Sequence, residues 1–205
     1  TLRTPTTTRG DPMPVRRFLP VALGAFLTAC SSTPLIDVPP SPTPEPTPVL
    51  ELGDFDPEGD FEVFDPCTEI PPEVLAEAGL IRRQREPFND AGRSISCSYD
   101  PVGRDLEGFF VITGDKVPRE RVMERGLLIA EGSTPHLPGL YLHHMGSGAA
   151  DECSAAVHTT RGRLVVDYIE LLTTRSRETL CTLAVEKLES VHHHLGENNG
   201  SFHRS

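Results

Sequence analysis

The chain has 205 residues and a formal net charge of −11 at pH 7. Such an acidic surface repels phosphate backbones and anionic headgroups, so it excludes nucleic acid as a partner and requires any membrane attachment to come from acyl chains. About 140 residues follow an acidic, proline-rich stretch, enough for one domain with a modest core.

The N-terminal region has the features of a lipoprotein signal peptide. Arg16 and Arg17 precede an apolar run over residues 18–27, which is too short to span a bilayer as a mature helix. The lipobox Leu27-Thr28-Ala29-Cys30 follows. We therefore expect residues 1–29 to be a signal peptide with upstream residues, and Cys30 to carry palmitate and other acyl chains. The alternative is an ordinary cleaved signal in which Cys30 is incidental.

Residues 30–63 are expected to form the lipid anchor and a spacer. The segment from Ser31 onward is dense in proline, threonine and acid, with a Pro-rich run over residues 39–48 that favours polyproline II. Like charges extend such a segment further. We place the globular domain at residues 64–195 and a disordered tail at residues 196–205.

The first half of the expected domain combines a short helix with a hairpin. A helix is predicted from Pro71 or Pro72 to Ala78, because proline suits a first turn and Gly79 a C-terminal cap. Strands are predicted over residues 95–99 and 106–113, joined as a hairpin. A charged surface helix over residues 118–125 stops before Gly126.

The second half is predicted to contain a further hairpin and a long helix. Residues 140–143 read as an edge strand, and residues 153–159 and 164–171 as a hairpin. The last helix begins near Ser176. Its apolar positions recur at steps of three and four, so one face should pack on the sheet, at Leu180, Leu183, Ala184, Leu188, Val191 and Leu195.

Four cysteines remain when Cys30 is set aside, an even number that predicts two disulfides in an exported domain. Three pairings are open. We favour Cys67 with Cys97 and Cys153 with Cys181, because each pair brackets one local unit and neither loop crosses the other. A metal site is the alternative, but no C-x-x-C or H-x-x-x-H spacing supports it.

The cysteine order provides a resemblance to a known family. Asp65-Pro66-Cys67, then Cys97-Ser98-Tyr99, then Cys153 in a strand and Cys181 in a terminal helix resemble an uncharacterised family of actinobacterial lipoproteins with a domain of unknown function. Its members often carry Trp where this chain has Tyr99. The resemblance implies an α+β fold, a small antiparallel sheet covered by an N-terminal short helix and a C-terminal helix, in a Mog1/PsbP-like arrangement. It brings no catalytic residue.

No pattern in the chain predicts catalysis, a cofactor or a metal. Candidate metal ligands are the histidines at His143-His144, His158 and His192-His193-His194. Adjacent strand residues point to opposite faces, however, and the triple falls where we expect a helix to fray. Gly146-Ser147-Gly148 lacks the spacing of a nucleophile elbow.

Two functions remain for a protein on the extracytoplasmic face of the cell membrane. The first is a non-enzymatic interaction or accessory domain with an unknown envelope protein as partner. The alternative is a binding module for a small apolar or lipid-like ligand held between the sheet and its helices, lined by Phe109, Phe110, Tyr141 and Ile169.

Overall fold

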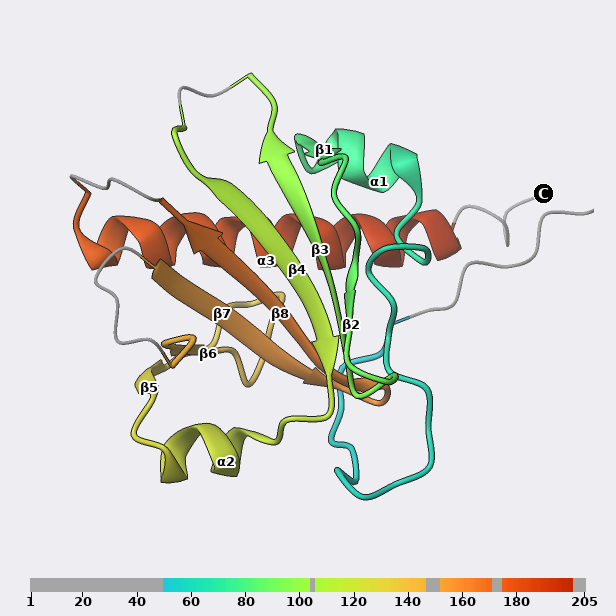
Figure 1. The fold of residues 1–205 in the computed structure, drawn as a ribbon, viewed down its shortest axis with the longest axis vertical. Helices are drawn as coiled ribbons and strands as arrows, with labels where there is room; N and C mark the ends of the chain where they lie inside the picture. The colour runs from blue at the N-terminus through green and yellow to red at the C-terminus, as the bar shows by residue number, and fades with distance from the viewer. Residues whose placement is uncertain (1–49, 104–105, 147–151, 171–174, 201–205) are drawn as a thin grey trace, which may run out of the picture. The chain divides into compact units, whose positions relative to one another are not determined.

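The structure is a computed structural model that describes residues 50–103, 106–146, 152–170 and 175–200. Figure 1 shows the elements that these residues form. In chain order they are α1 (Pro72–Glu77), β1 (Leu80–Arg82), β2 (Phe88–Asn89), β3 (Ser94–Pro101), β4 (Phe109–Asp115), α2 (Arg119–Glu124), β5 (Leu128–Glu131), β6 (Tyr141–His143), β7 (Glu152–Thr159), β8 (Gly162–Ile169) and α3 (Arg177–Gly200).

The strands form one antiparallel sheet, which confirms the predicted α+β class. Its order is β1-β3-β4-β8-β7-β6-β5, and β2 pairs with β3 beside this path. The two predicted hairpins are both present: Tyr99 pairs with Phe110 in the first, and Thr159 pairs with Gly162 in the second. The sheet is larger than expected, because the short strands β1, β2 and β5 were not predicted.

The strand β6 was expected at the edge of the sheet, and this expectation was wrong. It lies between β7 and β5, so β5 is the edge strand. The segment Leu128–Glu131 escaped prediction because it is only four residues long and its pairing with β6 contains a register shift between Leu128 and Ala130.

The helix α3 packs along one face of the sheet, against β7 and β8 (Figure 1). Strand side chains alternate between the faces, so Leu164, Val166 and Tyr168 of β8 enter this core. Ser176 caps the helix through a hydrogen bond from the backbone amide of Thr179 to its Oγ at 3.3 Å, where the sequence predicted a start.

The predicted buried face of α3 is confirmed at five of six positions, and Leu183 is the exception. Leu180, Ala184, Leu188, Val191 and Leu195 are buried. Leu183 is only half-buried, beside the hollow between α1 and α3. It lies one position off the line that Leu180, Ala184 and Leu188 follow, so its side chain reaches the margin of the core rather than its centre.

The helix is also longer than expected, since it continues to Gly200. The expected disordered tail at 196–205 is therefore wrong for residues 196–200, while residues 201–205 lie outside the described part. His192, His193 and His194 sit inside the helix and not at a frayed end. Among the described helices, none has the combination of length and apolar character needed to cross a bilayer.

The expected start of the folded part at Phe64 is too late. Leu50 is buried in the core, Leu52 forms a β-bridge with Thr159, and the backbone amide of Thr160 donates to the carbonyl of Glu51 at 3.0 Å. The composition of this segment concealed these contacts, because its acids point outward while a few apolar residues bind the end of the second hairpin. Residues 50–63 therefore belong to the folded unit.

The N-terminal segment crosses β4 so closely at Gly114 that only glycine fits there. A Cβ atom at Gly114 would lie 1.9 Å from the backbone carbonyl oxygen of Phe64. No other residue fits there without moving the segment, since real Cβ contacts are never that short.

Candidate functional site

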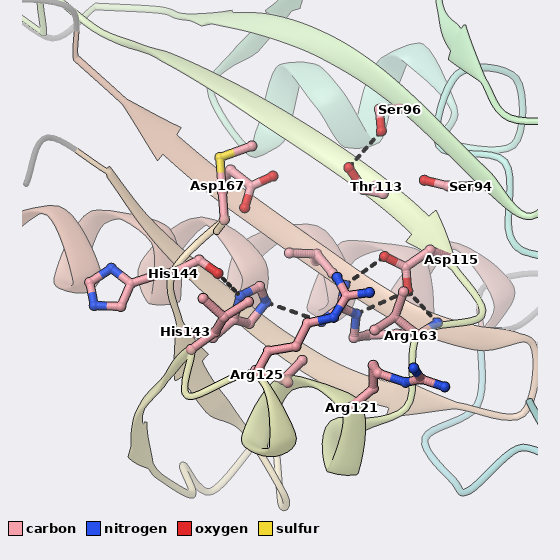
Figure 2. A pocket seen from close by; sticks show the side chains of 15 residues that line it. Ser94, Ser96, Thr113, Asp115, Arg121, Arg125, His143, His144, Arg163 and Asp167 are labelled. Carbon is pink, nitrogen blue, oxygen red and sulfur yellow. Dashed lines mark hydrogen bonds and ion pairs between the residues drawn. The ribbon is translucent and has the colours of Figure 1, made fainter. Parts of the chain in front are cut away.

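The face of the sheet opposite α3 carries a polar cavity of about 290 Å³ (Figure 2). The short helix α2 and the residues around it cover this face, with Val122 packed against Tyr141, Ala156 and Val165. The helix α2 has only six residues, and the cavity lies beside it. The cavity is lined by Ser94, Ser96, Thr113, Asp115, Val117, Arg121, Val122, Arg125, Leu127, His143, His144, Met145, Arg163, Val165 and Asp167.

An ion pair between Arg163 and Asp115 forms part of the sheet wall of the polar cavity. Arg163 Nε donates to Asp115 Oδ1 at 3.0 Å, and Nη2 donates to Oδ2 at 2.7 Å, so the contact is bidentate. Both side chains are buried. Burial lowers the pKa of Arg163, but the Asp115 carboxylate more than offsets this effect and raises it overall. The guanidinium is therefore a permanent positive charge, matched by one carboxylate.

His143 extends this pair as a neutral ring. Its Nδ1 lies 2.8 Å from the backbone carbonyl of His144, and its Nε2 lies 3.2 Å from Arg163 Nη1. A carbonyl only accepts and a guanidinium only donates, so Nδ1 carries the proton and Nε2 accepts from Arg163. Burial, and then the charge of Arg163, lower the pKa of His143 to about 4.

Asp167 is the one carboxylate of the cavity wall with an unsatisfied oxygen. Its side chain is 4% exposed, and its Oδ1 has no hydrogen-bond partner among the described residues. Burial raises the pKa of Asp167 to about 6, against the opposing effects of the Ser154 hydroxyl and of Arg163. Oδ1 thus lacks the donor that a buried carboxylate oxygen normally has.

Hydroxyl groups and arginines complete the cavity. Ser96 Oγ and Thr113 Oγ1 lie 2.8 Å apart on neighbouring strands β3 and β4. Arg121 and Arg125 are exposed on and just after α2, across the cavity from the sheet (Figure 2). The arrangement offers fixed donors, acceptors and charges around a wet space, which suits recognition of a small polar ligand.

No histidine cluster forms a metal site in the described part of the chain, where no group of three His, Cys, Asp or Glu side chains is placed to hold an ion. His143 uses both ring nitrogens within the cavity wall. His158 contacts the ring of Phe55 at the other end of the face, and burial lowers its pKa.

The four predicted disulfide residues pair as expected. Cys67 and Cys97 are bonded with a Cα–Cα distance of 5.4 Å, and Cys153 and Cys181 with one of 5.0 Å. The second bond ties β7 to α3. Cys30, the predicted lipidation site, lies outside the described residues.

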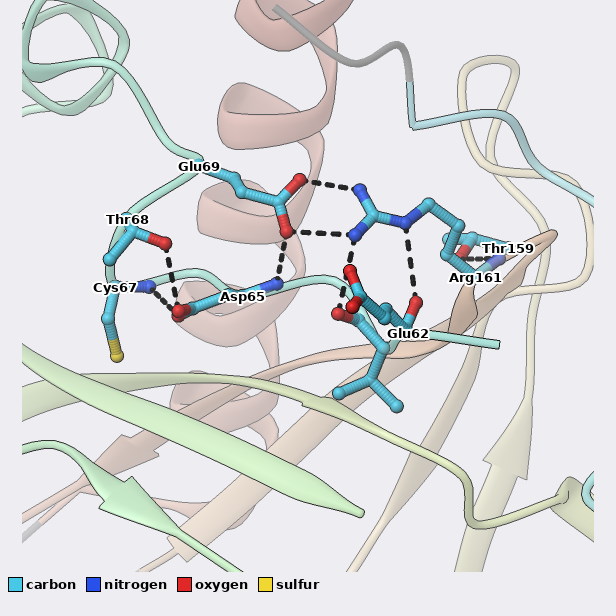
Figure 3. Close-up of polar contacts among 8 residues, drawn as sticks. Glu62, Asp65, Cys67, Thr68, Glu69, Thr159 and Arg161 are labelled. Carbon is cyan, nitrogen blue, oxygen red and sulfur yellow. Dashed lines mark hydrogen bonds and ion pairs between the residues drawn. The ribbon is translucent and has the colours of Figure 1, made fainter. Parts of the chain in front are cut away.

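The Asp65-Pro66-Cys67 motif has a local structural role, which Figure 3 shows. Asp65 Oδ1 accepts a hydrogen bond from the backbone amide of Cys67 and Oδ2 accepts one from the hydroxyl of Thr68, both at 2.8 Å. The carboxylate therefore fixes the turn that positions Cys67 for its disulfide with Cys97. The buried hydroxyl of Tyr99 donates to the carbonyl of Pro66 at 2.7 Å. Tyr99 thus secures the same turn.

Arg161, in the turn between β7 and β8, holds this N-terminal segment in place (Figure 3). Its Nη1 donates to Glu69 Oε2 at 2.5 Å and its Nη2 to Oε1 at 2.9 Å. The hydrogen bond to Glu69, opposed by burial, raises the pKa of Arg161. Both the motif and this clamp are structural, and neither borders the polar cavity.

The four residues expected to line an apolar pocket are not all brought together, although Phe109 and Ile169 are cross-strand partners. Phe110 is 1% exposed in the core beneath α3, whereas Phe109, Tyr141 and Ile169 lie on the opposite face of the sheet. Side-chain alternation separates Phe109 from Phe110. The space between the sheet and α3 is filled by Phe110 and other core side chains.

Apart from His143 and His144, the residues that line the polar cavity were not singled out in the sequence. Their signal was present in β8, where Arg163 and Asp167 alternate with apolar Leu164 and Val166. Alternation predicts a two-faced strand, but it does not tell whether the polar face meets bulk water or a second layer. The cover comes from α2, which lies 39 residues or more before Arg163 in the chain.

No curated protein and no solved structure matches the sequence of this chain. A family described as "Protein of unknown function (DUF3558)" matches residues 25–194, most of the chain. The protein belongs to this DUF3558 family of unknown function.

Proposed function

We propose that the protein is an exported lipoprotein, anchored by acyl chains on Cys30 to the extracytoplasmic face of the membrane, whose folded part is a non-enzymatic binding or accessory domain. The lipobox sequence Leu27-Thr28-Ala29-Cys30 supports the anchor. The two disulfides support an oxidising compartment. The Mog1/PsbP-like arrangement and the actinobacterial lipoprotein family, both implied by the resemblance, stay predictions.

The observation that carries the binding role is the polar cavity. Buried charged groups are costly unless paired, so Arg163, Asp115 and Asp167 on one wall do not serve stability best. Apolar residues of similar size would make a firmer core at these positions. A cavity that keeps charges in fixed places suits recognition, and this role requires no chemical step.

The anchor is tested by mass spectrometry of the protein from membranes of its own cell. We expect diacylglyceryl and a further acyl chain on Cys30, retention in the membrane fraction, and release of Cys30→Ser as unacylated protein. Unmodified wild-type protein in the cytoplasm would contradict the proposal.

A second candidate function is binding of a small apolar or lipid-like ligand. The observation that favours it is a hollow of about 460 Å³ between α3 and the β5–β6 edge, with Ile129, Leu142 and Val185 among its lining. It lies on the surface and not in the filled space between sheet and helix, where the ligand was expected. Lipid extraction of the natively purified protein tests it, and a stoichiometric lipid would favour this candidate.

A further inference from the structure

We propose that the polar cavity binds a small polyhydroxylated ligand that carries both an ammonium group and an acidic group, as an amino sugar phosphate does. The ammonium is assigned to Asp167, the acidic group to Arg121 and Arg125, and the hydroxyls to the polar side chains of β3 and β4. This inference rests on the proposed binding role and adds the chemistry of the ligand.

We infer the ammonium group of the ligand from the unsatisfied carboxylate oxygen of Asp167. Its Oδ1 is buried and has no hydrogen-bond partner among the described residues. The cation of the same wall, Arg163, is already matched by the bidentate contact with Asp115. A ligand ammonium supplies both the missing hydrogen bond and the missing positive charge. A neutral hydroxyl would supply only the first, and charge-assisted hydrogen bonds are about twice as strong as neutral ones.

We infer the acidic group of the ligand from two arginines on the wall opposite the sheet. Arg121 and Arg125 are four positions apart, so their side chains leave the same side of the α2 turn, and both line the cavity. Arg121 Nε also lies 3.9 Å from Glu124 Oε2, a long and exposed contact that contributes little. The two arginines form a positive rim in a protein whose net charge is −11. A guanidinium pair recognises phosphate or carboxylate by parallel N–H donors.

The size and the hydroxyl groups narrow the ligand further. The volume of about 290 Å³ is near the lower end for small-molecule sites and suits one substituted monosaccharide. The Ser96 and Thr113 hydroxyls, 2.8 Å apart, share one proton between them, which leaves the other proton and several lone pairs for hydroxyls of a ligand.

The test uses glucosamine 6-phosphate and two probes that each lack one of its charged groups. Glucose 6-phosphate lacks the ammonium, and glucosamine lacks the phosphate. Isothermal titration at pH 7.5 measures their affinity for the full chain with both disulfides oxidised. We expect glucosamine 6-phosphate to bind at least about tenfold more tightly than either other probe, since each charge-assisted contact is worth at least that factor.

The protein variants should separate the two contacts. Asp167→Asn should weaken the binding of glucosamine 6-phosphate by about tenfold and change the affinity for glucose 6-phosphate by no more than about twofold. Arg121→Ala with Arg125→Ala should weaken the binding of both phosphorylated probes by about tenfold and leave the affinity for glucosamine unchanged. Arg85→Ala with Arg93→Ala removes two exposed charges outside the cavity and should change no affinity. Bound glucosamine 6-phosphate should also lower the pKa of Asp167, followed by carboxyl ¹³C NMR.

Absence of saturable binding of glucosamine 6-phosphate up to about 10 mM would overturn the proposed ligand class. Equal binding of the three probes, or an unchanged Asp167 titration with the probe bound, would do so as well. None of these three results touches the proposed anchor, because acylation of Cys30 and membrane retention are measured independently of the cavity.

Discussion

Removal of Asp115 should strongly destabilise the protein, because it leaves the Arg163 guanidinium buried without a counter-charge. Asp115→Leu deletes the contacts at 3.0 and 2.7 Å to Arg163, and also the hydrogen bond at 2.9 Å from the backbone amide of Val117. Breaking a buried pair in this way costs about 3–5 kcal/mol. For a domain of this size that corresponds to a fall in Tm of about 6–20 °C.

Replacing both partners should recover most of this loss. In Asp115→Leu with Arg163→Met no unpaired charge remains, and apolar replacement of a buried pair is often neutral. The double variant should therefore be more stable than Asp115→Leu alone, although His143 loses the donor to its Nε2. Urea unfolding of the oxidised protein, followed by circular dichroism, gives the free energy of unfolding of each variant.

A surface ion pair provides the control. Arg83 and Asp100 lie 3.2 Å apart with half-exposed side chains, so Asp100→Ala should cost no more than about 1 kcal/mol. The reasoning fails if Asp115→Leu is no worse than Asp100→Ala, or if the double variant is no more stable than Asp115→Leu.

Three further changes test the packing and the pH dependence. Leu188→Asp should lower the free energy of unfolding by several kcal/mol more than Leu183→Asp, since Leu188 is fully buried and Leu183 is half-buried, and equal losses in urea would show that α3 docks differently. Deletion of residues 50–62 should lower the free energy of unfolding by about 3 kcal/mol or more, because apolar burial and backbone hydrogen bonds are lost. An unchanged melting temperature would place this segment outside the fold. With its pKa raised to about 6, Asp167 binds its proton more tightly in the folded state, so stability should rise by about 3 kcal/mol as pH falls from above 6 to below 4. The pKa of His143 is lowered to about 4, so protonation of His143 lowers stability as pH falls below about 6.5. The rise in stability due to Asp167 is therefore measured in the variant His143→Gln. Adding Asp167→Asn to this variant must abolish the rise.

Periodicity in the sequence identified the elements that are long or that have proline and glycine at their ends. The helix α1 begins after Pro71 and ends before Gly79, whose φ of 64° favours glycine, and both features were readable in the sequence. The disulfide pairing followed from the same local units. Short strands such as β2, with two residues, carry too little pattern to be found.

The functional site was harder to predict, because it depends on which layer covers the second face of the sheet. The polar residues at Arg163 and Asp167 are compatible with a solvated face. They become a cavity only because Val122 of α2 packs on Val165 and Tyr141. The composition of residues 50–63 misled in a similar way: a few apolar anchors such as Leu50 outweigh many acids. Contacts between distant segments decided both cases.

The two faces of β8 separate stability from recognition. On the α3 side, Leu164, Val166 and Tyr168 fill a dry core, and the Cys153–Cys181 bond fixes the neighbouring strand to the helix. On the other side, the same backbone holds Arg163 and Asp167 in place without their having to contribute to the core. Charges on a rigid strand keep their positions whether or not a ligand is present, which limits the entropy lost on binding. Because this wall is fixed by the sheet and not by the N-terminal segment, binding in the cavity and anchoring through Cys30 are separable properties that can be tested in separate variants.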